Sequence, residues 1–228
     1  MGRAIPVTLG RFTFASKKAA KDALRQLRDI HIDGSPILDE DAVDMLLDVV
    51  RTHPQAQQKV GPGITGFYVS EAPEFGTMCF YLRRTDGTVT DFSWNEAITP
   101  ASPIVRLRNA CRNAIAAEKM AYRDEAWPLA DVGLRVCPIT GRRYGRADAH
   151  VDHVPPDTLK RLVERWLAAS NIGVADVAVD HVGDLRAVDE IADAGLLQSW
   201  RAYHSEHARL RLISGEGNLR QGAREVGL

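Results

Sequence analysis

The feature of the sequence that most restricts the fold is the stretch 149–156, which places an acidic residue and a histidine just before two prolines. Pro155 and Pro156 cannot donate backbone hydrogen bonds to a sheet, so an extended segment has to end here. In an ideal strand Asp152 and His153 would point to opposite faces, and both can serve one ligand atom only where the strand stops or bends. We therefore expect a short strand that ends in an Asp-His pair.

A carboxylate beside an imidazole is suited to metal-assisted hydrolysis of a phosphodiester bond. The carboxylate can hold a hard divalent cation, and a neutral imidazole that titrates near ~6.5 can take a proton from water. The structural alternative is an Asp-His pair at a sheet edge that only closes a turn. These two residues do not decide between the alternatives, so the rest of the chain has to.

The composition is that of an ordinary globular protein, with 45% apolar and 26% charged residues in a chain of 228. No apolar run approaches the ~20 residues of a membrane span, and the start lacks the apolar centre of a signal peptide, so we expect a cytoplasmic protein without a membrane partner. Because the net charge is −1, a nucleic-acid role would depend on local basic patches. The widely spaced Cys79, Cys111 and Cys137 predict reduced thiols, and neither a disulfide framework nor a zinc ribbon.

The N-terminal part of the chain has the patterns of a mixed α+β domain. A strand with a bulge at Gly10 is expected before a helix capped by Ser16, and Asp39 caps a second helix that ends at His53-Pro54. Strands then flank Thr85-Asp86-Gly87, a strong hairpin signal because Asp-Gly accepts the positive φ angles of a type I′ turn. Without βαβ alternation, this order favours an antiparallel sheet with packed helices.

Two runs in this part, HPQAQQKVGPGITGFYVS and CFYLRRTDGTVTDFSWNEAI, resemble the DCL domain family, named for defective chloroplasts and leaves. The resemblance covers about residues 7–99. Plant members of the family are linked to ribosomal RNA processing and to a plant-specific RNA polymerase tail, so the resemblance implies a module that faces nucleic acid. The residues that carry it are His53-Pro54, Lys59, Gly61, Gly63-Ile64, Phe67, Cys79-Phe80, Arg83, Asp86-Gly87 and Asp91-Phe92-Ser93.

Side chains that could contact a nucleic acid occur in two groups. The N-terminal group could hold phosphates and stack a base, and it consists of Lys59, Arg83, Arg84, Tyr81 and Trp94. The second group lies just before the Asp-His stretch, where phosphates would have to pass, and it consists of Arg142, Arg143 and Arg146. In the structural alternative the aromatic rings pack the sheet and the cations are only solvated.

Pro103 is expected to begin a long basic helix that reaches about Arg123. After residue 134 the pattern is a strand ending near Val154, a series of helices, an alternating strand over Leu210–Ser214, and a last short helix opened by Asn218. The intervening helices are expected after Asp157, around residues 185–192, and after Ser199.

Without those middle helices the order is strand, strand, helix, which resembles the HNH endonucleases, the ββα-metal or His-Me finger class, over about residues 134–226. The resemblance implies that His153 activates water, that Asp152 and Asn218 bind one divalent ion, Mg²⁺ or alternatively Mn²⁺, and that His204 or His207 orients the base. The chain departs from the family in two ways. Asp152 and Asn218 are 66 positions apart, which requires a helical insertion, and the paired C-x-x-C knuckles are missing.

Other histidines have weaker patterns. His150 shares a strand face with Asp152, so it could be a further ligand, a phosphate contact or a structural residue. His53 and His181 are interpreted as structural.

The sequence thus predicts an α+β protein with a DCL-like domain over residues 1–101, a basic linker helix over 102–133 and an HNH-like nuclease domain with a helical insertion over 134–228. The expected function is that of a metal-dependent endonuclease, related to restriction or phage nucleases, that cuts DNA in preference to RNA after the N-terminal module binds it. A homodimer is one option for its assembly. A non-catalytic nucleic-acid adaptor and an RNA-processing factor are the alternatives.

Overall fold

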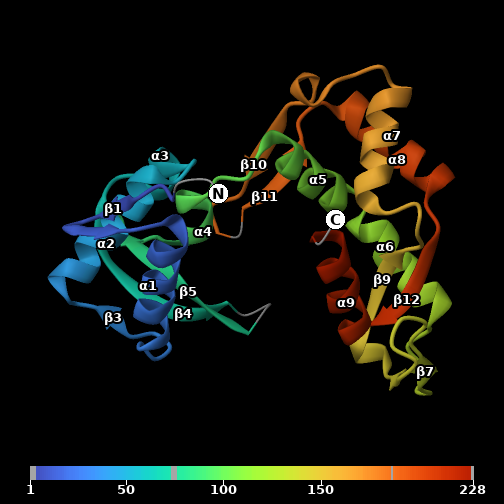
Figure 1. Cartoon of the computed structure of the whole chain (residues 1–228), viewed down its shortest axis with the longest axis horizontal. Helices are drawn as coiled ribbons and strands as arrows, with labels where there is room; N and C mark the ends of the chain where they lie inside the picture. The colour runs from blue at the N-terminus through green and yellow to red at the C-terminus, as the bar shows by residue number, and fades with distance from the viewer. Residues whose placement is uncertain (1–3, 73–75, 186, 227–228) are drawn as a thin grey trace. The chain divides into compact units, whose positions relative to one another are not determined.

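The computed structural model describes residues 4–72, 76–185 and 187–226 (Figure 1). The chain divides into two compact units. Unit 1 comprises Met1–Ser102 together with Gly183–Ala187, and unit 2 comprises Pro103–Val182 and Val188–Leu228. Among the described residues, no helix has the length and apolar character needed to cross a membrane.

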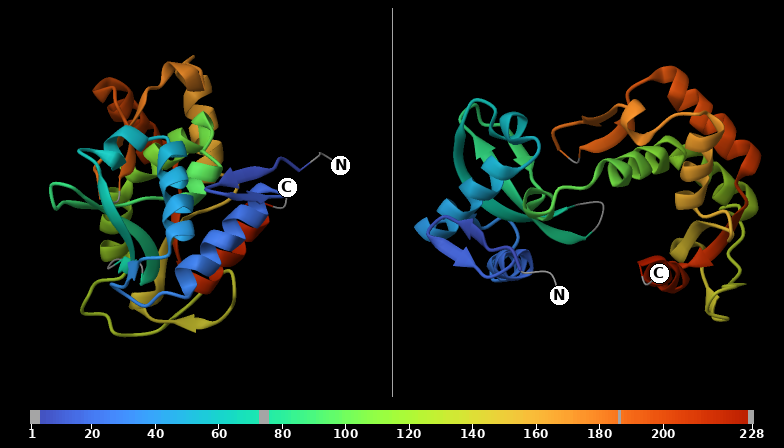
Figure 2. Two further views of the ribbon diagram at one scale, coloured as in Figure 1. Left: turned by 90° about the vertical axis from the view of Figure 1, so that its left-hand side faces the viewer. Right: turned by 45° about the horizontal axis from the view of Figure 1, so that its top comes forward.

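Unit 1 is an antiparallel sheet, in the order β3-β4-β5-β6, with helices packed on it (Figures 1 and 2). This confirms the mixed α+β class and the antiparallel N-terminal sheet. Its elements are β1 (Val7–Leu9), β2 (Phe12–Phe14), α1 (Lys17–Asp29), β3 (Pro36–Ile37), α2 (Glu40–Thr52), α3 (Ala56–Val60), β4 (Ile64–Ala72), β5 (Thr77–Arg84), β6 (Val89–Asp91) and α4 (Trp94–Ile98).

Local sequence rules decide where the first helices begin and end. The Ser16 side chain accepts the backbone N–H of Ala19 at the start of α1, and Asp39 accepts that of Ala42 at the start of α2. The expected bulge at Gly10 is wrong, because β1 and β2 pair as an antiparallel hairpin. Gly10 has a φ of 56°, a left-handed conformation that glycine adopts without strain and that closes the turn.

The core of unit 1 lies between one sheet face and helices α1 and α2. Alternate residues of β4 and β5, such as Val69 and Phe80, face this core and are fully buried. Leu24 of α1 and Leu46 of α2 meet them from the helices. Trp94, one of the predicted base-stacking residues, belongs to the same core, so it packs the fold and is not presented to a ligand.

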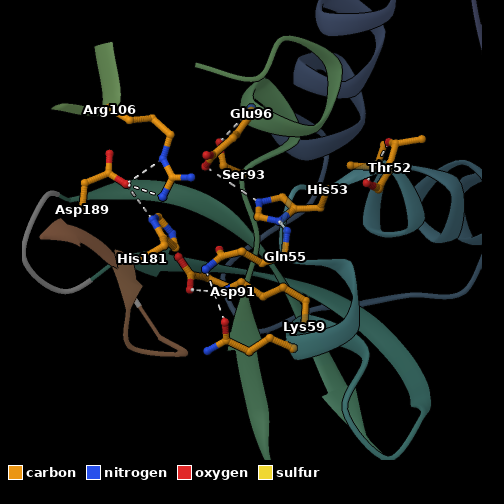
Figure 3. A network of polar contacts seen from close by, with 12 residues as sticks. Thr52, His53, Gln55, Lys59, Asp91, Ser93, Glu96, Arg106, His181 and Asp189 are labelled. Carbon is orange, nitrogen blue, oxygen red and sulfur yellow. Dashed lines mark hydrogen bonds and ion pairs between the residues drawn. The ribbon is translucent and has the colours of Figure 1, made fainter. Parts of the chain in front are cut away.

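Two cations are buried within unit 1 and already have protein partners. Arg84 donates to both carboxylate oxygens of Asp184, at 2.6 and 2.8 Å, and also to the backbone carbonyl of Lys59. The Lys59 ammonium donates to the Thr90 hydroxyl at 3.1 Å and lies 3.7 Å from the Asp91 carboxylate (Figure 3). Burial lowers the pKa of Lys59, and the carboxylates of Asp91 and Asp184 oppose that shift. These contacts argue against the phosphate role predicted for Lys59 and Arg84.

Unit 2 combines helices with short antiparallel strand pairs, β7-β8, β10-β11 and β9-β12. Its elements are α5 (Pro103–Ala114), α6 (Ala116–Ala126), β7 (Arg135–Val136), β8 (Arg143–Tyr144), the 3₁₀ helix η1 (Arg146–Asp148), β9 (Ala149–His153), α7 (Leu159–Ala169), the 3₁₀ helix η2 (Val174–Asp176), β10 (Val179–Val182), β11 (Val188–Ile191), α8 (Ala194–His207), β12 (Leu210–Ser214) and α9 (Gly215–Val226).

The expected long helix from Pro103 is interrupted at Ile115, which separates α5 from α6. Both flanking helices lie in unit 2, and α5 belongs to its core. Leu107 and Cys111 of α5 are fully buried with Trp166 and Trp200. The basic residues of α5 therefore lie on a core helix of unit 2.

The insertion between β9 and β12 is not purely helical. Residues 188–191 were expected in a helix but form β11, which pairs antiparallel with β10. Their apolar spacing fits a helix, but in the strand Val188 is exposed and the buried Asp189 shares the inward face with Ile191. On that face Asp189 bonds Arg106 and His181. The helix expected after Ser199 begins earlier, at Ala194, capped by Asp193. Ser199 lies inside it and accepts the indole N–H of Trp166.

We predict that Asp184→Ala will destabilise unit 1. The substitution leaves the buried Arg84 guanidinium without its carboxylate, and we expect a loss of roughly 2 kcal/mol in the free energy of unfolding. Urea unfolding monitored through Trp94 would measure it. Asp180→Ala, which removes an exposed carboxylate nearby in the sequence, is the control, and equal stability of the two variants would contradict the prediction.

Candidate functional site

A strand-strand-helix unit is assembled in space from β9, β12 and α9 (Figure 1). The two strands pair antiparallel, with His153 opposite Leu210 and Asp152 opposite Arg211. Helix α9 follows β12 without a connecting loop. A small core that includes Trp127, Cys137, Tyr144 and Ile213 packs this part of the unit. The strand predicted to end at the Asp-His pair and the strand predicted over Leu210–Ser214 are thus neighbours in the fold.

His153, at the end of β9, contacts His204 of α8. The two Nε2 atoms are 3.0 Å apart and the rings meet edge to face. The residues are only 7% and 2% exposed, so the contact is shielded from water. His207, the other candidate for this role, is exposed, and its ring stacks on Tyr203. The structure therefore brings His204, and not His207, to the candidate base.

Both imidazoles of this pair favour the neutral form. Burial lowers the pKa of His153 to about 3, and the electrostatic effects of Lys119, His204 and Arg112 act in the same direction. Burial also lowers the pKa of His204, while the Glu118 carboxylate opposes the shift. His153 is consequently unprotonated on one ring nitrogen at neutral pH, which is the form that can accept a proton.

Asp152 has a different neighbour from His153. Its Oδ2 accepts two hydrogen bonds from the Arg211 guanidinium, at 2.8 and 3.0 Å. No hydrogen bond to Oδ1 exists in the described part of the chain. Arg211 was missed by the sequence reasoning, because only the register of β9 against β12 places it opposite Asp152. The candidate metal ligand therefore carries an ion pair on one oxygen and leaves the other available.

The two predicted metal ligands, Asp152 and Asn218, are oxygen donors. Within residues 4–72, 76–185 and 187–226, no cluster of three or more His, Cys, Asp or Glu side chains could hold a metal ion. Asp152 offers one carboxylate oxygen, and Asn218 is exposed in the first turn of α9. Mg²⁺ commonly takes one or two protein oxygens and fills its remaining positions with water and substrate phosphate. The set lacks the thiolate and imidazole ligands of structural zinc.

Cys137 occupies a closely packed position near the start of α9. It is fully buried, and its Sγ accepts the backbone N–H of Ser214 at 3.4 Å. A Cβ added to Gly217 would lie 2.8 Å from the same sulfur, so glycine is required there. Cys137 thus serves the packing of the β12–α9 junction.

A basic groove lies beside β9. Its volume is about 180 Å³, and it is lined by Lys119, Met120, Arg123, Ala149, His150 and Val151. Burial lowers the pKa of Lys119, with Arg112 adding to the shift and Asp152 opposing it. The exposed His150 lines this groove together with Lys119 and Arg123, and such an arrangement suits a phosphate contact. Lys119 and Arg123 lie in the stretch predicted to be a basic helix, but neither was predicted as a site residue.

The three predicted arginines before β9 differ in exposure and in their contacts. Arg142 and Arg143 are exposed, and Arg142 lies 3.0 Å from the carboxylate of Glu216. Arg146 donates to the backbone carbonyl of Trp127 and to Asp124, so it is engaged in structural contacts. Phosphate contact by this group remains a prediction for Arg142 and Arg143.

The predicted nucleic-acid contacts of unit 1 also include buried and exposed residues. Tyr81 is 8% exposed and stacks on Tyr68, with ring centroids 5.2 Å apart. Arg83 is exposed and its guanidinium lies over the Tyr68 ring at 5.0 Å. Tyr68 was missed because the sequence alone does not show which face of its strand is turned away from the core. Arg83 and Tyr68 are thus a cation and a ring that lie together outside the core of unit 1.

His53 and His181 make structural contacts, as the sequence suggested (Figure 3). In unit 1 the Nδ1 atom of His53 accepts the backbone N–H of Gln55, and its Nε2 lies 3.9 Å from Glu96. In unit 2 the Nδ1 atom of His181 lies 3.0 Å from the buried carboxylate of Asp189.

We predict that the stability of unit 2 falls as the pH is lowered from about 6.5 towards about 3. In this window the unfolded chain protonates His153 and the folded chain does not, so unfolding takes up a proton. The expected loss is about 1.4 kcal/mol per pH unit for each proton. His153→Gln should reduce the slope and His207→Gln should not, measured by urea unfolding. A slope that is the same in parent and His153→Gln would contradict the assignment.

Comparison with known proteins identifies part of the chain. Residues 26–98 match the family described as "Protein of unknown function (DUF3223)". Among curated proteins of Arabidopsis thaliana, DNA-directed RNA polymerase IV subunit 1 is 28% identical over 106 residues, which are 46% of this chain and 7% of that protein. DNA-directed RNA polymerase V subunit 1 is 31% identical over 99 residues, 40% of this chain and 5% of that protein.

Two further proteins are similar to the chain. Protein EMBRYO DEFECTIVE 514 of Arabidopsis thaliana is 34% identical over 61 residues, which are 26% of this chain and 30% of that protein. The chain thus spans less than a third of the length of these curated relatives. An uncharacterized protein from Rhodospirillum rubrum, solved by NMR, has 30% identity and a TM-score of 0.39 over 42% of this chain and 91% of that one. The match of residues 26–98 to DUF3223, a DCL-type domain, supports the DCL part of the resemblance.

Proposed function

We propose that unit 2 is a metal-dependent phosphodiester hydrolase of the HNH type and that the DCL-type domain binds its nucleic-acid substrate. The supporting observation is the buried His153–His204 pair at the end of β9, the first strand of the β9–β12–α9 unit. Burying two imidazoles against each other costs free energy that apolar side chains would not cost. Titratable groups held in this way are concentrated at functional sites.

In the proposed reaction His153 accepts the proton of the attacking water, and His204 holds the His153 ring in place. The cations of the groove, Lys119 and Arg123, hold the phosphates of the substrate. Asp152 and Asn218 would hold Mg²⁺, which supplies neutralisation of the charge that develops on the leaving oxygen. With that charge neutralised, one general base suffices.

Nucleic acid is the proposed partner for two reasons. The groove beside β9 is cationic, and two of the curated relatives are named as subunits of DNA-directed RNA polymerases. Neither reason separates DNA from RNA. DNA is proposed first because the HNH resemblance favours it.

A non-catalytic adaptor is the second candidate, and one contact favours it. The Arg211 guanidinium already neutralises Asp152, so in this alternative the strand-strand-helix unit serves as a scaffold for nucleic-acid binding. The two candidates differ in whether His153 is required for an activity or only for stability.

We predict that His153→Ala lowers phosphodiester cleavage by ~10²–10⁴-fold while metal and nucleic-acid binding persist. Asp152→Asn should lower both metal affinity and cleavage, because an amide is a weaker ligand than a carboxylate. Asn218→Ala should have a milder effect that raised Mg²⁺ or Mn²⁺ partly restores. Cleavage of plasmid DNA and of a structured RNA, each with and without EDTA, would measure these effects.

His207→Ala is the matched control, since His207 is an exposed histidine of the same helix as His204. It should cleave like the parent. Cleavage that persists in EDTA, or a fully active His153→Ala variant, would refute the hydrolase mechanism. A parent protein that binds nucleic acid but cleaves no substrate would favour the adaptor.

A further prediction concerns the DCL-type domain. Arg83→Ala should weaken nucleic-acid binding, and the slope of log K against log salt should become smaller by about 0.7–0.9 because one phosphate contact is lost. Fluorescence anisotropy with single-stranded DNA and RNA of the same sequence would measure both quantities. Arg51→Ala, an exposed arginine of α2 paired with Asp48, is the control. An unchanged slope in Arg83→Ala would exclude this contact.

A further inference from the structure

The Glu118 carboxylate lies near the ring nitrogen of His204 that does not contact His153. Oε2 of Glu118, on α6, lies 3.4 Å from Nδ1 of His204. That nitrogen is buried, and no regular hydrogen bond reaches it in the described part of the chain. The carboxylate nevertheless acts electrostatically on the His204 ring, and the Glu118 side chain is 40% exposed. Glu118, His204 and His153 thus form a continuous series of polar groups from α6 through α8 to β9.

The order of these groups determines which ring nitrogens carry protons. An ionised carboxylate can only accept, so the neutral His204 ring carries its proton on Nδ1, facing Glu118. Its Nε2 is then an acceptor, and the 3.0 Å contact requires the proton of His153 to be on Nε2. The remaining nitrogen, Nδ1 of His153, is left unprotonated. No hydrogen bond to that atom exists among the described residues.

We propose that Glu118 is a positioning residue that sets the tautomers of His204 and His153 and thereby makes Nδ1 of His153 the proton acceptor. The catalytic consequence rests on the proposed hydrolase function, whereas the tautomers themselves do not. Without Glu118, His204 can carry its proton on Nε2 and donate to His153. That exchange would place the proton of His153 on Nδ1 and block the base.

The proton transfer balances within this series. An O–H bond of water breaks, its electron pair stays on the oxygen that attacks phosphorus, and the proton forms a new bond to Nδ1 of His153. The proton on Nε2 of His153 can then move to Nε2 of His204. The resulting cation on His204 lies 3.4 Å from the Glu118 carboxylate. Glu118 thereby stabilises the protonated state that the reaction produces.

The tautomers can be measured without any substrate. In the full chain at neutral pH, long-range ¹H–¹⁵N NMR spectra should show His204 protonated on Nδ1 and His153 protonated on Nε2. Glu118→Ala should shift both rings towards the opposite tautomers, whereas Glu118→Gln should retain the parent tautomers in part because its amide oxygen still accepts. Glu125→Ala is the control, since Glu125 is an exposed glutamate of the same helix. Because Glu118 is partly exposed and alanine favours helices, the variants should fold.

A parent spectrum with His204 protonated on Nε2, or identical tautomers in parent and Glu118→Ala, would overturn the proposal. For cleavage, Glu118→Ala should lower kcat by about 10–100-fold with little change in KM, and Glu125→Ala should match the parent. Expected tautomers in a parent that cleaves nothing would support the role of Glu118 and refute the hydrolase function instead. Expected tautomers with full activity in Glu118→Ala would refute the positioning role.

Discussion

The antiparallel pairing of β9 with β12 is the contact on which the candidate site depends. It brings the Asp-His stretch next to a strand more than fifty residues later in the sequence. The same pairing places Arg211 against Asp152, and it sets the start of α9 directly after the second strand. The intervening segment supplies α8 and therefore His204. A one-residue slip would move Arg211 to the other face and remove its ion pair with Asp152.

The contact between His153 and His204 shows how burial adjusts chemistry in this unit. Desolvation keeps His153 neutral, which preserves its ability to accept a proton but weakens it as a base. A carboxylate behind the second ring acts in the opposite direction, because it stabilises positive charge on the pair. The balance between these effects, rather than either imidazole alone, decides whether the pair can serve in proton transfer.

In the DCL-type domain, charge and exposure do not coincide. Lys59 and Arg84 are buried and bonded to Thr90 and Asp184, so these basic residues contribute to the fold. Arg83, their neighbour along β5, points to the other side of the strand and is exposed over Tyr68. Alternation along a strand thus separates two adjacent arginines into a structural and a surface role.

Local patterns in the sequence were sufficient for the caps at Ser16 and Asp39, for the strands that became β9 and β12, and for the antiparallel sheet, because each depends on neighbouring residues. The hairpin at Asp86-Gly87 also forms, but the expected type I′ turn does not, since Gly87 has a positive φ and Asp86 does not. Local patterns could not decide between His204 and His207, reveal Arg211 or Glu118, or distinguish the buried Arg84 from the exposed Arg83. Nor could they show that residues 188–191 form a strand, since the inward turn of Asp189 is stabilised by distant partners. Those outcomes belong to the tertiary structure, because burial and partners are set by segments that lie far apart in the chain and meet only when it folds.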